Sequence, residues 1–385
     1  MSKILVIQHA DILTPFERLE QAALVIEDGK IASVGKEDIQ KKYPGAETLD
    51  ASECIITPGW MDIQFNGGFG KDFTLEPESI WEVAAQLPRW GTTRFCPTIV
   101  TSPMETFDKA IAVWHQGPPT GWKGAIPLGL HFEGPFLNLQ KKGAHNPVYL
   151  QSPDLELIKD WRLENGVRLV TLAPELPGAL AMAQELIARG VTVSAGHSMA
   201  TYEQAMAGFK TGITAGTHLY NAMPTIEHRA PGLAGAVLTN GEITAGVIAD
   251  GIHSHPAMVD LAWRSKGNRR FVLVTDAMAA LGMPSGNYIL GDFEVVVDET
   301  SARLKGTNTL AGSILSQEKA LKNLMAFTGC SLQQAIPTLT STPAELLHLP
   351  DTGRIIPGSP ADLTIITPDG SVMTTIIGGE IVYQH

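Results

Sequence analysis

Cysteine and long apolar runs are scarce in this sequence, and their scarcity excludes several classes of protein. Only three cysteines occur among the 385 residues, Cys54, Cys96 and Cys330. They are odd in number, far apart and without C-x-x-C spacing, which argues against a disulfide framework and against a cysteine zinc site. No apolar run reaches about 18 residues, the length of a membrane span, and the run at residues 4–7 is too short for the core of a signal peptide. We therefore expect a soluble, cytoplasmic protein.

Positive charge is also in short supply. Lys and Arg number 28 against 40 Asp and Glu, so the formal net charge is −12 at pH 7. No basic stripe or Lys/Arg cluster occurs, which argues against a nucleic acid or an anionic membrane as partner. The net charge describes the whole surface, so a pocket can still be locally positive and bind an anionic small molecule. With 44% hydrophobic residues, the chain can bury a sizeable core.

Both ends of the chain carry hairpin signals. Asp28-Gly29 separates two β-rich runs near the start, and Gly378-Gly379 separates two runs near the end. The C-terminal strands are expected at residues 362–366, 373–377 and 380–383. Either end alone would be too small for independent stability, so we expect residues 1–55 and 350–385 to form one small β-sandwich domain together.

Between the two ends, short β-branched runs alternate with amphipathic helical patterns. Their mean spacing is about 30 residues, the length of one β-α unit. A capping box formed by Thr201 and Gln204 predicts a helix over 202–210, and a second helix is expected over 180–189. Repeated β-α units predict a (β/α)8 TIM-type barrel over residues 56–349, because a doubly wound sheet would normally end after about five or six strands. The expected strands span residues 61–65, 93–98, 126–132, 168–172, 191–195, 213–217, 243–249 and 271–275.

Residues of metal-ligand type follow three of these strands, where the chemistry of such barrels lies. Glu133 ends the third run on the same face as His131, and the following Gly134-Pro135 cannot continue a sheet. His197 and His218 come directly after the fifth and sixth runs. A lone histidine is more often a packing residue than a ligand, and a glutamate in a loop can simply lie in water. A carboxylate and two imidazoles at equivalent positions predict a metal site with one position left open for water.

An aspartate ends the eighth run. Asp276 follows an apolar parallel strand. Burying a carboxylate there costs free energy unless it contacts water or a cation, or serves in proton transfer. Capping of the next helix is the alternative interpretation, because aspartate is common at that position. We favour proton transfer beside the predicted metal site.

The strand-end residues resemble those of the amidohydrolase superfamily, and within it those of the deacetylases that act on N-acetylated amino-sugar phosphates. The resemblance covers essentially the whole chain in the expected order. Each motif alone is weak, whereas the ordered set is specific. The motifs are at 58–68 (PGWMDIQFNGG), 131–136 (HFEGPF), 143–145 (GAH), 195–198 (AGHS), 218–223 (HLYNAM), 250–253 (DGIH), 275–277 (TDA), 310–313 (LAGS), 353–355 (GRI) and 358–363 (GSPADL).

The resemblance implies a metal-dependent amide hydrolase. Glu133, His197 and His218 would hold the metal; Zn²⁺ suits this set, and Fe²⁺, Mn²⁺ or Co²⁺ could occupy it. Many amidohydrolases carry His-x-His at the end of the first strand, where this chain has Gln64 and Asn66. No Lys follows the fourth run to bridge two metals. We therefore expect one divalent metal per subunit and a vestigial second metal position.

The resemblance also assigns catalytic and substrate-binding roles. Asp276 would take a proton from the attacking water and then deliver it to the leaving nitrogen, and His145 would help hold the oxyanion. Arg229 and His253 would bind a phosphate, with Arg229 reaching across the interface of a homodimer or a higher homo-oligomer. Taken alone, His145 could instead be a surface-loop residue, and Arg229 could equally be a solvated loop residue. The other substrate contacts would come from Ala144, Asn221, Ala222, Asp250, Gly251, Ile252, Leu310, Ala311 and Gly312.

The expected reaction is hydrolysis of the acetamide of N-acetyl-D-glucosamine 6-phosphate to D-glucosamine 6-phosphate and acetate, in amino-sugar catabolism or recycling. Deacetylation of the galacto epimer, or of an N-acyl amino acid, would use the same metal site and Asp276. A non-catalytic barrel scaffold would be expected to lack part of the ligand set, and a sugar-phosphate isomerase on the same fold would not need that set. The complete set favours the hydrolase.

Overall fold

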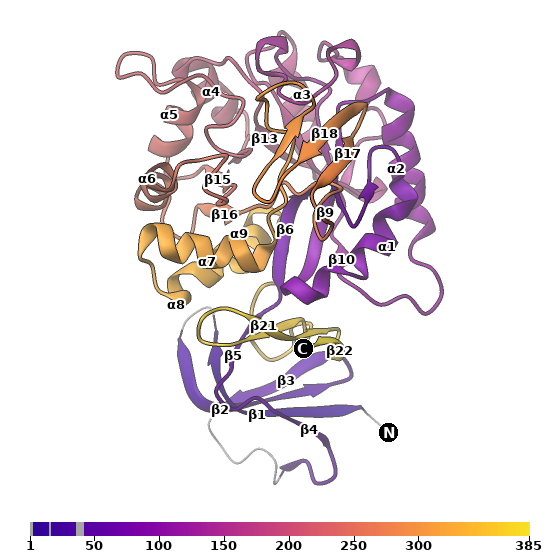
Figure 1. The fold of residues 1–385 in the computed structure, drawn as a ribbon, viewed down its shortest axis with the longest axis vertical. Helices are drawn as coiled ribbons and strands as arrows, with labels where there is room; N and C mark the ends of the chain where they lie inside the picture. Colours follow the sequence, from indigo (N-terminus) through magenta and orange to yellow (C-terminus); the bar gives the residue numbers. More distant parts are fainter. Residues whose placement is uncertain (1–2, 15–16, 36–41) are drawn as a thin grey trace.

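Eight parallel strands enclose the centre of the molecule, and a mainly antiparallel sheet lies beneath one end of them (Figure 1). The computed structural model describes residues 3–14, 17–35 and 42–385; residues 1–2, 15–16 and 36–41 of the predicted N-terminal β segment lie outside the described ranges. The parallel strands are β6 (Trp60–Phe65), β9 (Thr92–Val100), β11 (Leu130–Glu133), β12 (Val167–Leu172), β13 (Thr192–Ala195), β14 (Ala215–Gly216), β15 (Thr244–Val247) and β16 (Phe271–Leu273).

The eight expected strands are all present and pair in sequence order, as a TIM-type barrel requires. The run at 126–132 divides into β10 (Ile126–Pro127) and β11. The segment after β16 closes the ring against β6: the Asp276 N–H donates to the Gln64 carbonyl at 2.9 Å, and Phe65 forms a parallel bridge with Ala277. The barrel prediction is therefore confirmed, and the ring closes between β6 and the segment that contains Asp276.

Helices cover the outside of the barrel (Figure 1). The two expected helices are α3 (Ala179–Ala188) and α4 (Tyr202–Lys210), and the capping box of Thr201 and Gln204 is present at the start of α4. No helix within the described ranges has both the length and the apolar character needed to cross a membrane. The other helices are α1 (Ile80–Ala84), α2 (Met104–Gln116), α5 (Gly232–Thr239), α6 (Pro256–Lys266), α7 (Gln317–Thr328), α8 (Leu332–Ala335) and α9 (Ser341–Leu346).

Strands from both ends of the chain form one eight-stranded sheet at the foot of the barrel. One apolar cluster joins the two ends, with Ile7 and Leu24 packed in the same core as Leu363. Asp28 (φ 47°) and Gly29 (φ 79°) form the expected two-residue turn. The prediction that both termini build one β unit is confirmed. Its strands are β1 (Ile4–Leu13), β2 (Arg18–Glu27), β3 (Lys30–Gly35), β4 (Glu47–Asp50), β5 (Ile55–Pro58), β20 (Leu363–Ile366), β21 (Val372–Ile377) and β22 (Glu380–Gln384).

A small antiparallel sheet inserted after β16 is absent from the sequence-based prediction. It consists of β17 (Gly286–Leu290), β18 (Phe293–Val297) and β19 (Ala302–Leu304), and we call residues 286–304 the flap. The turn between its first two strands is anchored on two sides. The Gly291 N–H donates to Asp72 Oδ2 at 3.2 Å, and Asn146 Nδ2 donates to Asp292 Oδ2 at 2.7 Å. Asp72 and Asn146 lie on the connections after β6 and β11, so the flap lies at the mouth of the barrel.

Candidate metal-dependent active site

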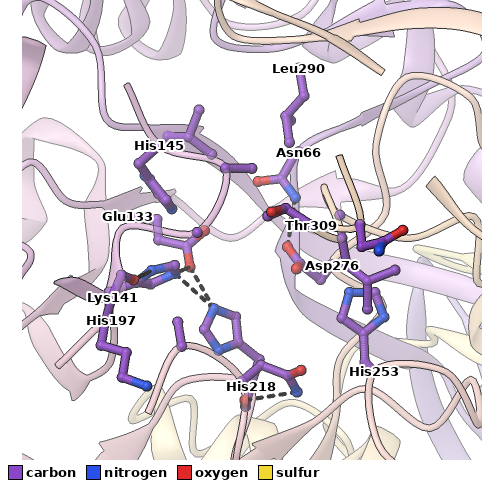
Figure 2. Close-up of a pocket in the computed structure, with 18 of the residues that line it drawn as sticks. Asn66, Glu133, Lys141, His145, His197, His218, His253, Asp276, Leu290 and Thr309 are labelled. Carbon is purple, nitrogen blue, oxygen red and sulfur yellow. Dashed lines mark hydrogen bonds and ion pairs between the residues drawn. The ribbon is translucent and has the colours of Figure 1, made fainter. Parts of the chain in front are cut away.

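Three buried side chains converge at the mouth of the barrel, each at or just after the end of a strand. Glu133 is the last residue of β11, and His197 and His218 each follow their strands, β13 and β14, by two residues. Glu133 Oε1 lies 3.1 Å from His197 Nε2 and 3.0 Å from His218 Nε2, and the two Nε2 atoms are 3.0 Å apart (Figure 2). Zinc bonds of about 2.0–2.2 Å separate tetrahedral ligand atoms by about 3.4 Å. The donor set and its spacing therefore fit one divalent cation.

The two histidines are held in a backbone conformation that few non-glycine residues adopt. The φ angle is 48° at His197 and 30° at His218, and such geometry persists only where the surroundings enforce it. His197 Nδ1 donates to the Lys141 carbonyl at 2.8 Å, and this contact directs Nε2 toward Glu133. Burial by itself raises the pKa of Glu133, but hydrogen bonds and charges from the two histidines hold it well below its ordinary value. Glu133 is therefore ionised, as a metal ligand must be.

Asp276 lies beside the triad and is connected to it through an amide. Its Oδ1 accepts from Asn66 Nδ2 at 2.7 Å and from Gln64 Nε2 at 3.2 Å. Gln64 Nε2 also donates to Glu133 Oε1 at 3.2 Å. Burial, followed by the negative charge of Glu133, raises the pKa of Asp276 from 3.8 to about 6. The amides at the predicted vestigial metal position thus serve as hydrogen-bond donors to two carboxylates, a role that needs no second cation.

His145 reaches the same pocket from the loop after β11. Its ring packs edge-on against His197, with the centroids 4.4 Å apart. Its Nδ1 accepts from the Thr101 N–H at 3.3 Å and lies 2.9 Å from the Thr101 hydroxyl. Burial, followed by the charge of His197, lowers the pKa of His145 to about 3. His145 is therefore neutral near pH 7, with its proton on Nε2 as a hydrogen-bond donor.

A pocket of about 390 Å³ opens at the triad and has the size of a small-molecule site. Figure 2 shows the triad, His145, Asp276 and His253 facing it. The predicted substrate residues that line it are Ala144, Asn221, Ala222, His253, Leu310 and Gly312. It is also lined by residues absent from the sequence-based prediction, namely Val100, Gln140, Lys141, Leu290, Asn308 and Thr309.

Five predicted substrate residues lie outside this lining. Asp250 holds His253, which lines the pocket. Its Oδ2 lies 2.6 Å from His253 Nδ1, and its Oδ1 accepts from the N–H groups of Ile252 and His253. Ala311 is fully buried in the cluster that also supports the flap. Arg229 is exposed on the loop after β14, away from the pocket lining of its own chain. The five are Arg229, Asp250, Gly251, Ile252 and Ala311.

Two connections bring in five of the six lining residues that the sequence did not indicate, and the sixth, Val100, ends β9. Gln140 and Lys141 belong to a short 3-10 turn between two of the motifs. Leu290 comes from the flap and Thr309 from the segment after it. A signal for the flap is present in the sequence, because alternating side chains on both sides of Gly291-Asp292 are typical of a hairpin. That hairpin would have indicated a further β element beside the eighth strand.

The chain matches the amidohydrolase family over residues 55–382. It is 39% identical to the N-acetylglucosamine-6-phosphate deacetylase of Bos taurus, over 95% of this chain and 94% of the bovine protein. It is 34% identical to the protein of the same name from Bacillus subtilis (strain 168), over 100% of this chain and 98% of that protein.

Solved structures agree with this assignment. The N-acetylglucosamine-6-phosphate deacetylase from Pasteurella multocida has a TM-score of 0.92 and 31% identity, covering 99% of this chain and 100% of that one. A mutant of the Mycobacterium smegmatis N-acetyl-D-glucosamine-6-phosphate deacetylase, in complex with N-acetyl-D-glucosamine-6-phosphate, has a TM-score of 0.89 and 33% identity, covering 100% of both chains. Within the described ranges, Glu133, His197 and His218 form a buried set of side chains that could hold a metal ion. The chain therefore belongs to the amidohydrolase family of metal-dependent hydrolases.

Proposed function

We propose that this protein hydrolyses the acetamide of N-acetyl-D-glucosamine 6-phosphate to D-glucosamine 6-phosphate and acetate. The observation that carries the proposal is the triad of Glu133, His197 and His218, joined to Asp276 through Gln64 at a pocket of about 390 Å³. The choice of substrate is supported by the relatives of that name and by the related structure that holds the acetylated sugar phosphate.

Glu133, His197 and His218 would hold one divalent cation, with Zn²⁺ as first choice and Fe²⁺, Mn²⁺ or Co²⁺ as alternatives. When bound, such a cation lowers the pKa of a coordinated water toward ~7 and polarises an amide carbonyl. Gln64 and Asn66 donate hydrogen bonds to the carboxylates around them, and neutral amides are poor zinc ligands beside imidazole. We therefore assign one cation per chain.

Asp276 carries a proton between the two halves of the reaction. With a pKa of about 6 it is ionised near neutral pH and accepts a proton from the attacking water. When the C–N bond breaks, the same group gives that proton to the departing amine and returns to its ionised form. The hydrogen bonds from Asn66 and Gln64 keep Oδ1 in place, which leaves Oδ2 for the proton.

His145 stabilises the acetyl oxygen as negative charge develops on it. Its Nε2–H donates to that oxygen, while the contacts of Nδ1 with Thr101 fix the tautomer. Burial keeps the ring neutral, with a pKa of about 3. The donor is therefore in place throughout the neutral pH range.

His253 and Arg229 are assigned to the sugar phosphate. His253 faces the pocket and is held there by Asp250. Arg229 is exposed and outside its own pocket, which suits a homodimer in which it reaches the pocket of the other subunit. Leu139 and Ile226, 62% and 37% exposed, lie on loops that also supply pocket residues and could pack in such an interface. The sugar contacts are assigned to Ala144, Asn221, Ala222, Leu310 and Gly312.

Acetate release tests the proposal. It is measured from N-acetyl-D-glucosamine 6-phosphate with and without a chelator, beside the galacto epimer and an N-acetyl amino acid. We expect release from the gluco substrate that stops when the metal is removed and returns when Zn²⁺ is restored. A faster reaction with the galacto epimer or with the N-acetyl amino acid would identify that compound as the substrate instead. Absence of metal-dependent acetate release from all three would contradict the proposed function.

A further inference from the structure

Glu175, on the loop after β12, receives three hydrogen bonds without lining the pocket or touching the triad. Its Oε1 accepts from Asn138 Nδ2 at 2.9 Å and from the Met199 N–H at 2.6 Å, and its Oε2 accepts from the Ser198 hydroxyl at 2.6 Å. Within the described ranges it forms no ion pair with a Lys or Arg. Hydrogen bonds to an ionised carboxylate are short and strong, so this group firmly joins the segments that supply its donors.

One of these segments carries the metal ligand His197. Ser198 and Met199 follow His197 directly, and both donate to Glu175. The Ser198 N–H also donates to the Ala222 carbonyl at 3.1 Å. Because His197 has a φ of 48°, its conformation must be enforced by its surroundings. Glu175 fixes the chain immediately after this strained residue.

The other segment orients the His197 ring. Asn138 donates its side-chain amide to Glu175, and its N–H donates to the His197 carbonyl at 2.9 Å. Asn138 Oδ1 accepts from the Gln140 N–H at 2.9 Å and so caps the 3-10 turn that ends at Lys141. The Lys141 carbonyl accepts from His197 Nδ1 at 2.8 Å. Through Asn138, Glu175 therefore also positions the Lys141 carbonyl. This carbonyl keeps the proton of His197 on Nδ1 and leaves Nε2 for a metal.

We propose that Glu175 is a positioning residue for the metal centre. It lies after the barrel strand β12, which supplies none of the assigned ligands, and it ties together the loops after β11 and β13 so that His197 presents Nε2 to the cation. This inference rests on the metal site proposed above. Glu175 acts through the orientation of His197, which sets both the metal affinity and, in the metal-loaded protein, kcat, whereas substrate binding is unaffected. A carboxylate that only stabilised its loop would change neither the metal affinity nor kcat.

The test is the dissociation constant for Zn²⁺, measured on the full chain by competition with a chromophoric chelator. Glu175→Met keeps the length of the side chain but removes both acceptors, and we expect Zn²⁺ to bind about 10- to 100-fold more weakly. Glu175→Gln keeps one acceptor and can donate to the Ser198 hydroxyl, so its loss should be at the lower end of that range. Glu185→Met is the matched control, because Glu185 lies on α3, pairs with Arg189 just after that helix, and has a side chain that is 41% exposed. Its Zn²⁺ affinity should equal that of the wild type.

The possible results separate the role of Glu175 from the existence of the metal site. An unchanged Zn²⁺ affinity in folded Glu175→Met would overturn the inference, even if the metal-free protein melted at a lower temperature. At saturating Zn²⁺, a lower kcat with a KM near the wild-type value supports the inference, whereas a change in KM alone contradicts it. If Glu175→Met does not fold, Ser198→Ala and Asn138→Leu each remove one donor, and wild-type affinity in both would overturn it equally. A wild-type protein that binds no Zn²⁺ would instead overturn the proposed metal site.

Discussion

The two walls of the pocket are built in different ways. One wall consists of strand ends, where the ionisable residues stand within three positions of a barrel strand, and the hydrogen-bonded barrel fixes them. The other wall consists of connections, the flap and the segment after it, anchored through side-chain contacts such as Asn146 with Asp292. We propose that the strand-end wall performs the chemistry together with His145 from the loop after β11, whereas the connection wall fits the substrate. The strand-end wall is Glu133, His197, His218 and Asp276, and the connection wall includes Leu290, Asn308, Thr309 and Leu310.

Removing the proton carrier from the strand-end wall should give the largest effect. Asp276→Asn keeps the shape and can still bond Asn66 and Gln64 after reorientation, but it cannot accept a proton. We expect kcat to fall by on the order of three decades or more, while Zn²⁺ content and substrate binding stay near wild type. Steady-state kinetics with metal analysis measure both. Near-normal turnover of a metal-replete Asp276→Asn protein would remove Asp276 from the proton-transfer role.

Removing the oxyanion donor should give the next largest effect. His145→Leu deletes the Nε2–H that we assign to the acetyl oxygen, and we expect kcat to fall about 10²- to 10³-fold with little change in KM. His115→Leu on the outer helix α2 is the control, because His115 is exposed and does not line the pocket. A loss confined to KM would contradict the oxyanion role and would assign His145 to substrate fit instead.

A smaller effect is expected for the phosphate contact. Arg229→Ala removes a guanidinium that we assign to the phosphate of the substrate in the partner subunit. We expect KM for N-acetyl-D-glucosamine 6-phosphate to rise about 10- to 100-fold, as loss of a charged hydrogen bond would produce. KM for unphosphorylated N-acetylglucosamine should not change. Equal effects on both substrates would exclude Arg229 from the phosphate site.

The smallest effect is the pH dependence of the unmodified protein. Asp276 works as a base only when ionised, and its pKa is raised to about 6, so kcat/KM should be level above that pH. Below the pKa it should fall about tenfold per pH unit, because the protonated fraction grows. A bound cation lowers the pKa of a neighbouring carboxyl, so about 6 is the upper bound for the midpoint. A midpoint well above 6 would assign the titration to another group.

The strand-end wall was predictable because its signals are local. Glu133, His197, His218 and Asp276 each follow a short apolar run, and a parallel barrel brings the ends of such runs to one face. The face was also predicted correctly for His131, which lies on the inner side with Glu133. His131 is nevertheless a packing residue one layer deeper, bonded to the hydroxyls of Thr98 at 3.1 Å and Thr171 at 2.8 Å. The alternation of side chains along a strand indicates on which face a residue lies, but not how deep in the barrel it lies.

The connection wall was harder to predict because its signals depend on distant partners. Leu290 lines the pocket only because the flap turn is bonded to Asp72 and Asn146, which lie far away in the sequence. Lys141 reaches it through a turn held by Asn138. Glu175 has no motif of its own, since its role depends on donors from two other loops. Such contacts have no periodicity that a sequence pattern can reveal.

The central claim is that one cation at the strand-end wall supports amide hydrolysis. The most direct test titrates Zn²⁺ into metal-free protein while acetate release from N-acetyl-D-glucosamine 6-phosphate is measured. We predict that activity rises in proportion to added Zn²⁺ up to one equivalent per chain and is constant beyond it. A need for two equivalents, or activity that does not depend on the metal, would contradict the account.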